Sequence, residues 1–222
     1  MQSATSNSKT KELDFDKTKS FIERRKAVVA NGVSVFVPSS AVSAHGATII
    51  DANGNELIDF GGGIGVLNAG HCPPPVVKAI QEQAEKLIHA CFNISTYELY
   101  MELSEKLVSL FPHGDKTKVM LTNTGAESIE NAIKIARQAT KRSAVLCYSE
   151  AFHGRSMMAM TLTSKINYKI NCGPFAPEVY RLPFPNFYHE GKGLSENDFA
   201  EQELLKLYDA THSLVDPDNI AA

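Results

Sequence analysis

The chain has 222 residues, of which 43% are hydrophobic and 21% are charged, and its formal net charge is −3. This composition is typical of a globular protein with enough apolar material for a buried core. The slightly negative charge, without a dense run of Lys and Arg, argues against nucleic acid or an anionic membrane as a partner. No apolar run approaches the roughly 18 residues of a spanning helix, and the polar N-terminus lacks a signal-peptide core, so we expect a cytoplasmic protein.

The first part of the chain is predicted to be β-rich and locally paired. Residues 1–15 are expected to form a flexible tail, and 16–30 a helix that ends at the following Asn-Gly pair. Alternating valines over 33–37 predict a short strand. Residues 47–51 and 56–60 predict a hairpin around a tight Asn-Gly turn.

After the glycine cluster at 61–65, the pattern changes to alternating strands and helices. Helices are predicted from the Pro-rich start at 73 to 89, from the capping-box residues Ser95 and Glu98 onward, and over 126–140 and 195–211; strands are predicted over 118–122, 143–148 and 179–182, with 149–178 irregular. This alternation predicts an α/β protein with a parallel sheet. The last residues, from 216, are expected to lead into another strand.

The four cysteines show neither the paired spacing of a zinc site nor that of a redox motif. We expect reduced, mostly buried thiols and no metal centre.

The turn at Thr124, Gly125 and Ala126 is a candidate phosphate site. An apolar run precedes it and an amphipathic helix follows, so unpaired backbone N–H groups and the positive end of a helix dipole would point at one spot. A plainer alternative stays open, because Thr124 and Glu127 also match a capping box, which needs no ligand.

A second cluster, Phe152, His153, Gly154 and Arg155, follows the next predicted strand. Ligands of open α/β sheets bind at the carboxyl ends of the strands, where both clusters fall. Phe152 could stack on a flat heteroaromatic ring or belong to the core. Arg155 could pair with a substrate carboxylate or form a surface ion pair of little energetic value. His153 would be a neighbour of the ring, and we assign it no proton transfer.

The glycine cluster does not match the dinucleotide-binding pattern. Val66 and Asn68 stand where the third glycine would have to be, and the cluster follows a hairpin. A nicotinamide enzyme is therefore disfavoured. The sequence also lacks the P-loop, nucleophile-elbow and zinc-protease motifs.

Four ordered motifs resemble those of the class III pyridoxal-phosphate aminotransferases, a family that includes 4-aminobutyrate aminotransferase. They are the segments 59–71, 122–128, 130–137 and 152–155. The resemblance extends from about residue 20 to the end. It implies a fold-type-I pyridoxal-phosphate transferase, of which 16–72 would be the N-terminal segment of the small domain. Residues 73–222 would be the first part of the large domain, incomplete at the C-terminus.

The resemblance also implies roles for individual residues. Gly125 and Ala126 would contact the phosphate of pyridoxal 5′-phosphate, with Thr124 beside them. Phe152 would stack on the pyridine ring, and His153 and Gly154 would shape that wall. The substrate contacts would be made by Arg155, which would hold a carboxylate, and by Ile64. The chemistry implied is amino-group transfer from an ω-amino acid such as 4-aminobutyrate to a 2-oxo acid, with 2-oxoglutarate expected, in a homodimer.

The chain departs from the family pattern in two places. Pro74 stands where the family often has His. The family's Schiff-base lysine is expected beyond residue 222, and neither Lys134, Lys165 nor Lys169 lies in its sequence context, so no catalytic residue is assigned and the chain alone is expected to be inactive. Two alternatives stay open: a non-catalytic dimerisation module, or another class III member such as an acetylornithine or ornithine aminotransferase.

Overall fold

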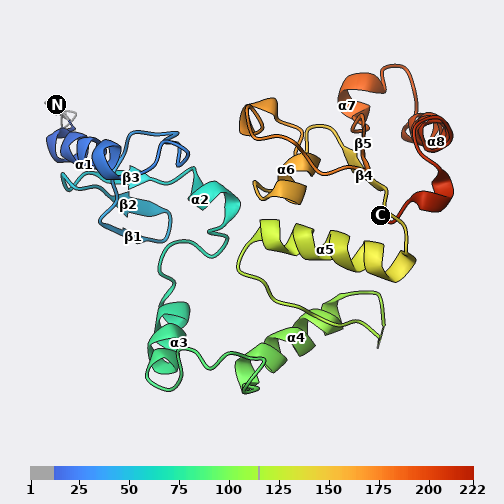
Figure 1. Ribbon diagram of the computed structural model, residues 1–222. Coiled ribbons are helices and arrows are strands. Elements are labelled where there is room, and N and C mark those ends of the chain that lie inside the picture. Colours follow the sequence, from blue (N-terminus) through green and yellow to red (C-terminus); the bar gives the residue numbers. More distant parts are fainter. Residues whose placement is uncertain (1–12, 115) are drawn as a thin grey trace, which may run out of the picture. The chain divides into compact units, whose positions relative to one another are not determined.

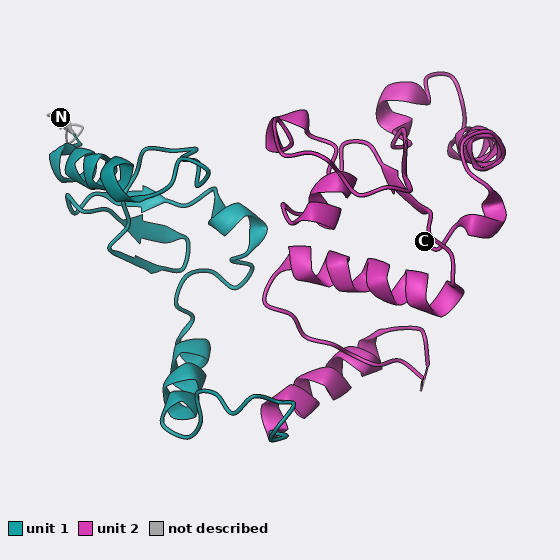
Figure 2. Ribbon diagram, viewed as in Figure 1, with its two compact units in different colours: residues 1–97 teal, residues 98–222 magenta. Residues whose placement is uncertain are grey.

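The computed structural model describes residues 13–114 and 116–222 and divides the chain into two compact units, Met1–Tyr97 and Glu98–Ala222 (Figure 2). Most of the predicted tail, 1–12, lies outside the described residues. The predicted domain boundary between residues 72 and 73 stays a prediction. None of the described helices is both long and apolar enough to cross a membrane.

The first unit holds three strands and three helices among its described residues (Figure 1). They are α1 (Asp16–Val28), β1 (Ser43–His45), β2 (Thr48–Ile50), β3 (Glu56–Ile58), α2 (Gly62–Gly65) and α3 (Pro74–Ala84). The strands form one antiparallel sheet in the order β1-β2-β3, with Thr48 opposite Ile58. The predicted hairpin is therefore confirmed, and β1 is a strand that the sequence did not predict.

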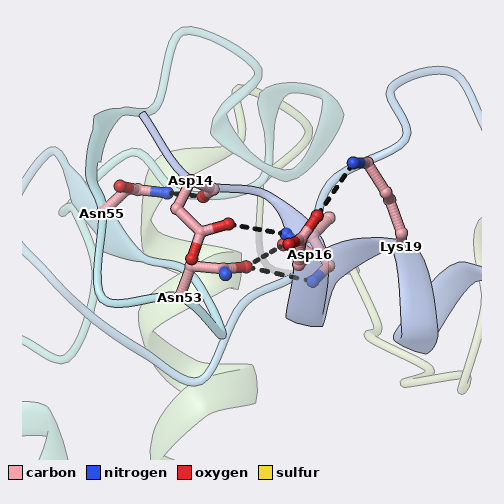
Figure 3. A network of polar contacts seen from close by, with 6 residues as sticks. Asp14, Asp16, Lys19, Asn53 and Asn55 are labelled. Atoms are coloured by element: carbon pink, nitrogen blue, oxygen red, sulfur yellow. Dashed lines mark hydrogen bonds and ion pairs between the residues drawn. The ribbon is translucent and has the colours of Figure 1, made fainter. Parts of the chain in front are cut away.

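The turn of this hairpin is tied to the start of α1. Asp51 is almost fully buried, and its Oδ1 accepts hydrogen bonds from the backbone N–H groups of Asn53 and Asn55 at 2.9 and 2.7 Å. Asn53 Oδ1 in turn accepts from the backbone N–H of Thr18 at 3.0 Å, and Asn55 Nδ2 donates to the Asp14 carbonyl (Figure 3). These bonds fix the first turn of α1, which has no side-chain cap from Phe15.

The second unit is built around two parallel strands. Its described elements are α4 (Glu98–Leu110), α5 (Gly125–Thr140), β4 (Val145–Tyr148), α6 (Met157–Leu162), the 3₁₀ turn η1 (Ile166–Tyr168), β5 (Val179–Leu182), α7 (Phe187–Glu190), α8 (Glu196–Ser213) and the 3₁₀ turn η2 (Pro217–Asn219). β4 pairs with β5 in parallel, Val145 opposite Val179. The predicted parallel α/β character is confirmed.

The last residues run beside β4. Ala144 forms a parallel bridge with Ile220, and Leu146 N donates to the Ala222 carbonyl at 2.9 Å. Successive amides of a strand point to opposite sides, so β4 lies between β5 and this final segment. The expectation that the chain leads into another strand here is met.

Apolar side chains join α5 and α6 to this sheet. The buried cluster comprises Val145, Cys147, Met158 and Leu162, with Ile129 and Ile133 of α5 packed against it. The core of the second unit therefore places the start of α5 and the loop before α6 in one packed assembly.

Two predicted strands are wrong. Residues 33–37 and 118–122 are extended or bent, and neither pairs with another strand in the described part of the chain. A strand is stabilised by a neighbour's hydrogen bonds, which an alternating or apolar pattern alone does not supply. Leu121 N instead donates to the Tyr100 hydroxyl at 2.9 Å.

Other boundaries also differ from the predictions. The helix predicted over 73–89 ends at Ala84, and the helix predicted from the Ser95 capping box begins at Glu98. The region predicted as irregular, 149–178, contains α6 and η1. All four cysteines are free as expected, but only Cys147 is buried, so the expectation of mostly buried thiols is wrong.

Candidate functional site

The N-terminus of α5 has the capping box that the sequence allowed. Thr124 is the N-cap, and its hydroxyl accepts from Glu127 N at 3.1 Å, while Glu127 Oε2 accepts from Asn123 N at 2.8 Å. The first helical bond runs from Ser128 N to the Thr124 carbonyl. The amides of Gly125 and Ala126 precede it, and such first-turn amides have no acceptor within their helix. The capped helix therefore keeps donors for an anion.

The loop 152–155 lies directly against this helix start. Gly154 has φ +128°, and a β-carbon on it would meet the Ala126 β-carbon at 2.7 Å and that of Ala159 at 3.1 Å. Only glycine fits this close approach without strain. The two motifs, which lie more than twenty residues apart in the sequence, therefore meet in space.

Together they line a cleft of about 650 Å³. It contains every predicted site residue of the second unit and three further ones; its lining residues are Thr124, Gly125, Ala126, Ser128, Ile129, Phe152, His153, Gly154, Arg155 and Ser156. Since Gly125 has open space where a β-carbon would stand, a ligand can approach the backbone at this point.

The side chains of the loop offer three different contacts. The Phe152 ring is 55% exposed and meets Tyr168 edge-on at 5.4 Å between centroids, which leaves ring surface free for stacking. His153 Nδ1 is buried without a hydrogen-bond partner among the described residues. Arg155 is exposed and forms no ion pair within the described part of the chain. Its cation is therefore not consumed by a protein carboxylate.

Two buried or half-buried side chains that the sequence did not single out hold this loop. Thr163 is fully buried, and its Oγ1 accepts from His153 N at 2.9 Å and donates to the Gly154 carbonyl at 3.0 Å. Glu130 Oε1, on α5, accepts from Ser156 Oγ at 2.7 Å. No local motif marks either residue, because their partners lie 9 to 26 positions away.

Burial acts to raise the pKa of the Glu130 carboxyl. The hydrogen bonds from Ser156, Ala159 N and Met158 N, together with the nearby Lys134 ammonium, outweigh that effect and lower the pKa below its ordinary value. Glu130 is therefore a carboxylate in the folded chain at neutral pH.

Ile64 belongs to the first unit. It lies in α2 at φ +61°, and its side chain is 83% exposed. Asp59 Oδ1 accepts from the amides of Gly61 and Gly62, and His71 Nε2 lies 2.8 Å from Asp59 Oδ2, so this pair holds the glycine turn. The role of Ile64 toward a substrate stays a prediction.

Comparisons with known proteins match nearly the whole chain to one family. The model of the family "Aminotransferase class-III" matches residues 28–222. A protein described as a probable 4-aminobutyrate aminotransferase from Bacillus subtilis is 44% identical over 200 residues, which is 90% of this chain and 46% of that protein. The 5-aminovalerate aminotransferase DavT of Pseudomonas putida is 42% identical over 91% of this chain and 46% of its own length.

Solved structures agree with this match. An (S)-enantioselective omega-transaminase from Thermomicrobium roseum has a TM-score of 0.81 at 28% identity, covering 92% of this chain and 48% of that one. The ornithine aminotransferase of Toxoplasma gondii has a TM-score of 0.74 at 27% identity, covering 95% of this chain and 45% of that one. The chain belongs to the class III aminotransferases, a family that uses pyridoxal phosphate. It matches roughly the first half of fold-type-I structures and spans about half the length of the curated relatives.

Proposed function

We propose that this chain carries the phosphate-binding and ring-stacking part of an aminotransferase that moves the amino group of an ω-amino acid to a 2-oxo acid. The observation that supports it is the meeting of the α5 N-terminus with the loop 152–155 in one cleft. The preferred amino donor is 4-aminobutyrate, because two similar proteins, one from Bacillus subtilis and GabT of Escherichia coli, are named for it. The proposed acceptor is 2-oxoglutarate, and the proposed assembly of the complete enzyme is a homodimer.

The residues of the cleft fit pyridoxal phosphate by their donor chemistry. The amides of Gly125 and Ala126, at the start of a 16-residue helix, suit a phosphate dianion. The free surface of Phe152 suits the flat pyridine ring, and the unpartnered Nδ1 of His153 offers a hydrogen bond at the cleft wall. When bound, the cofactor supplies an electron sink for the amine carbon.

Arg155 is the proposed anchor for the substrate carboxylate. A guanidinium binds a carboxylate through two parallel hydrogen bonds, and Arg155 has no competing ion pair in the described structure. 5-Aminovalerate and ornithine also carry a carboxylate, so Arg155 alone selects the class of amino acid and not its length.

The first experiment measures cofactor binding by the purified 222-residue chain. Pyridoxamine 5′-phosphate is the probe, because it lacks the aldehyde that reacts with surface lysines. We expect saturable binding, followed by the fluorescence polarisation of the probe, and competition by inorganic phosphate. Phe152→Leu should weaken binding of the probe at least fivefold and leave the competition constant of phosphate within twofold.

The matched control is Phe111→Leu in the same unit. Phe111 is 53% exposed and stacks on His113, so its environment resembles that of Phe152, yet it lies outside the cleft. Equal losses in the two variants, or no binding by the parent chain, would contradict the proposed cofactor site.

A second experiment locates any covalent attachment. The chain is mixed with pyridoxal phosphate, reduced with borohydride and mapped by mass spectrometry, and turnover of 4-aminobutyrate with 2-oxoglutarate is assayed alongside. We expect absent or scattered lysine labelling and no turnover. Stoichiometric labelling at a single lysine, with turnover, would show that the chain holds a complete catalytic site.

A further inference from the structure

The loop that lines the cleft continues into α6, whose N-terminus is held by a side chain from another helix. Ser156 is the N-cap residue of α6, but its hydroxyl makes no capping bond within its own helix. Glu130 Oε1 takes the capping role instead, accepting from Ser156 Oγ at 2.7 Å, Met158 N at 2.9 Å and Ala159 N at 3.3 Å. One carboxylate oxygen therefore binds three consecutive donors of the segment 156–159.

Glu130 and the proposed phosphate cradle share one rigid helix. Glu130 lies five residues after Gly125 on α5, which is roughly 7.5 Å along the helix axis. The segment that it binds begins directly after Arg155. The distance between the cradle amides and the loop 152–155 is therefore set through α5 and this carboxylate.

The opposite end of the loop has an independent attachment. Thr163 Oγ1 binds His153 N and the Gly154 carbonyl, and Gly154 packs on Ala126. Without Glu130, the loop would still be held at its middle, whereas the residues after Arg155 would lose their acceptor. We expect loosening, and not detachment, of the ring-stacking wall.

From these contacts we propose that Glu130 is a positioning residue, which holds Phe152 and Arg155 in register with the Gly125–Ala126 amides so that one ligand can use the ring wall and the cradle together. This inference rests on the proposed cofactor site. It predicts that Glu130 matters for a ligand that spans both parts and not for one that occupies the cradle alone.

The test compares two probes on the 222-residue chain. Glu130→Ala is expected to weaken binding of pyridoxamine 5′-phosphate at least tenfold, while the affinity for inorganic phosphate changes less than twofold. Glu130→Gln keeps an acceptor oxygen of the same reach, so its affinity for pyridoxamine 5′-phosphate should stay within about threefold of the parent. Glu105→Ala, which removes an exposed carboxylate of α4 in the same unit, is the matched control.

Hydrogen exchange without ligand gives a second readout. The amides of Met158 and Ala159, and those of 152–156, should exchange faster in Glu130→Ala than in the parent, while β4 amides should not change. If Glu130→Ala does not fold, Glu130→Asp, whose carboxylate ends one methylene short, takes its place with the same two expectations.

The outcomes separate this inference from the proposed function. If the parent chain does not bind pyridoxamine 5′-phosphate, the proposed cofactor site fails and the inference fails with it. If the parent binds but Glu130→Ala binds equally well, or loses both probes in proportion, the positioning role is overturned and the cofactor site stands.

Discussion

Gly154 approaches Ala126 so closely that a β-carbon on Gly154 would lie 2.7 Å from the Ala126 β-carbon. This contact joins the loop after β4 to the first turn of α5. It is the point where the proposed ring wall and the proposed phosphate cradle meet. A cleft built from two segments of distant sequence depends on such contacts for its shape.

Gly154→Ala should therefore be strongly destabilising. The substitution adds a steric overlap with Ala126 to the strain of φ +128°, and we expect a loss of about 3 kcal/mol in the free energy of unfolding. Gly193→Ala is the matched control, since Gly193 has φ +83° and open space at the β-carbon position, and it should lose about 1 kcal/mol. Urea denaturation followed by circular dichroism measures both. Equal losses would mean that the contact with Ala126 is not tight.

Thr124→Ala tests whether the helix cap and the cradle act together. Removing an N-cap hydroxyl costs about 1 kcal/mol of stability. Ser195 caps α8 with the same geometry, accepting from Asp198 N at 3.1 Å, so Ser195→Ala should cost a similar amount. Only Thr124→Ala should also weaken binding of inorganic phosphate, measured by competition. A similar loss of phosphate affinity in both variants would point to a global effect.

Thr163→Val removes the hydroxyl that holds His153 and Gly154 while keeping the side-chain shape. Because Thr163 is fully buried, the His153 amide would lose its acceptor in a place without water, and we expect a loss of about 2 kcal/mol. Thr140→Val, at an exposed position of α5 where the hydroxyl binds the Ala136 carbonyl, should lose less than half as much. Thermal melting of both variants, with the parent as reference, checks the difference.

The pair Asp59 and His71 gives the first unit an acid-sensitive contact. The hydrogen bond from His71, and those from the amides of Gly62 and Gly61, hold the pKa of the Asp59 carboxyl below its ordinary value. A folded pKa below the unfolded value of about 3.9 means that this stabilisation is complete above the unfolded pKa. It is lost as the pH falls through the lower folded pKa.

An NMR titration of the Asp59 carboxyl carbon should show this lowered pKa directly. Asp59→Asn should reduce the pH dependence of unfolding below about pH 4, where carboxylates begin to bind protons. Glu56→Gln removes one negative charge from the same unit without touching the glycine turn and serves as the control. An Asp59 carboxyl that titrates at or above the ordinary value would contradict the role assigned to His71.

Elements with strong local signals were predicted close to their observed bounds. α5 was expected over 126–140 and begins at Gly125, and α8 was expected from Ser195, which is its N-cap. β5 was predicted over its observed residues, Val179–Leu182. Caps, turn residues and apolar periodicity act within a few positions of one another, so they can be read along the chain.

α6 was missed for a physical reason. Its residues, Met157–Leu162, are nearly all buried, so the helix has no polar face and shows no helical period in the sequence. Strand pairing had the same difficulty at 33–37, where the alternation of valines was right for a strand and no neighbouring strand was there to pair with it.

The sequence by itself determined the family, the parallel α/β character of the second unit and the residues of the two motifs that line the cleft, because each of these is carried by residues near one another in the chain. The tertiary structure alone decided that Gly154 packs on Ala126, that Thr163 binds the loop from within and that Glu130 caps a helix other than its own. Those contacts join residues 10 to 28 positions apart, and a hydrogen bond or a steric contact over that separation exists only once the chain has folded.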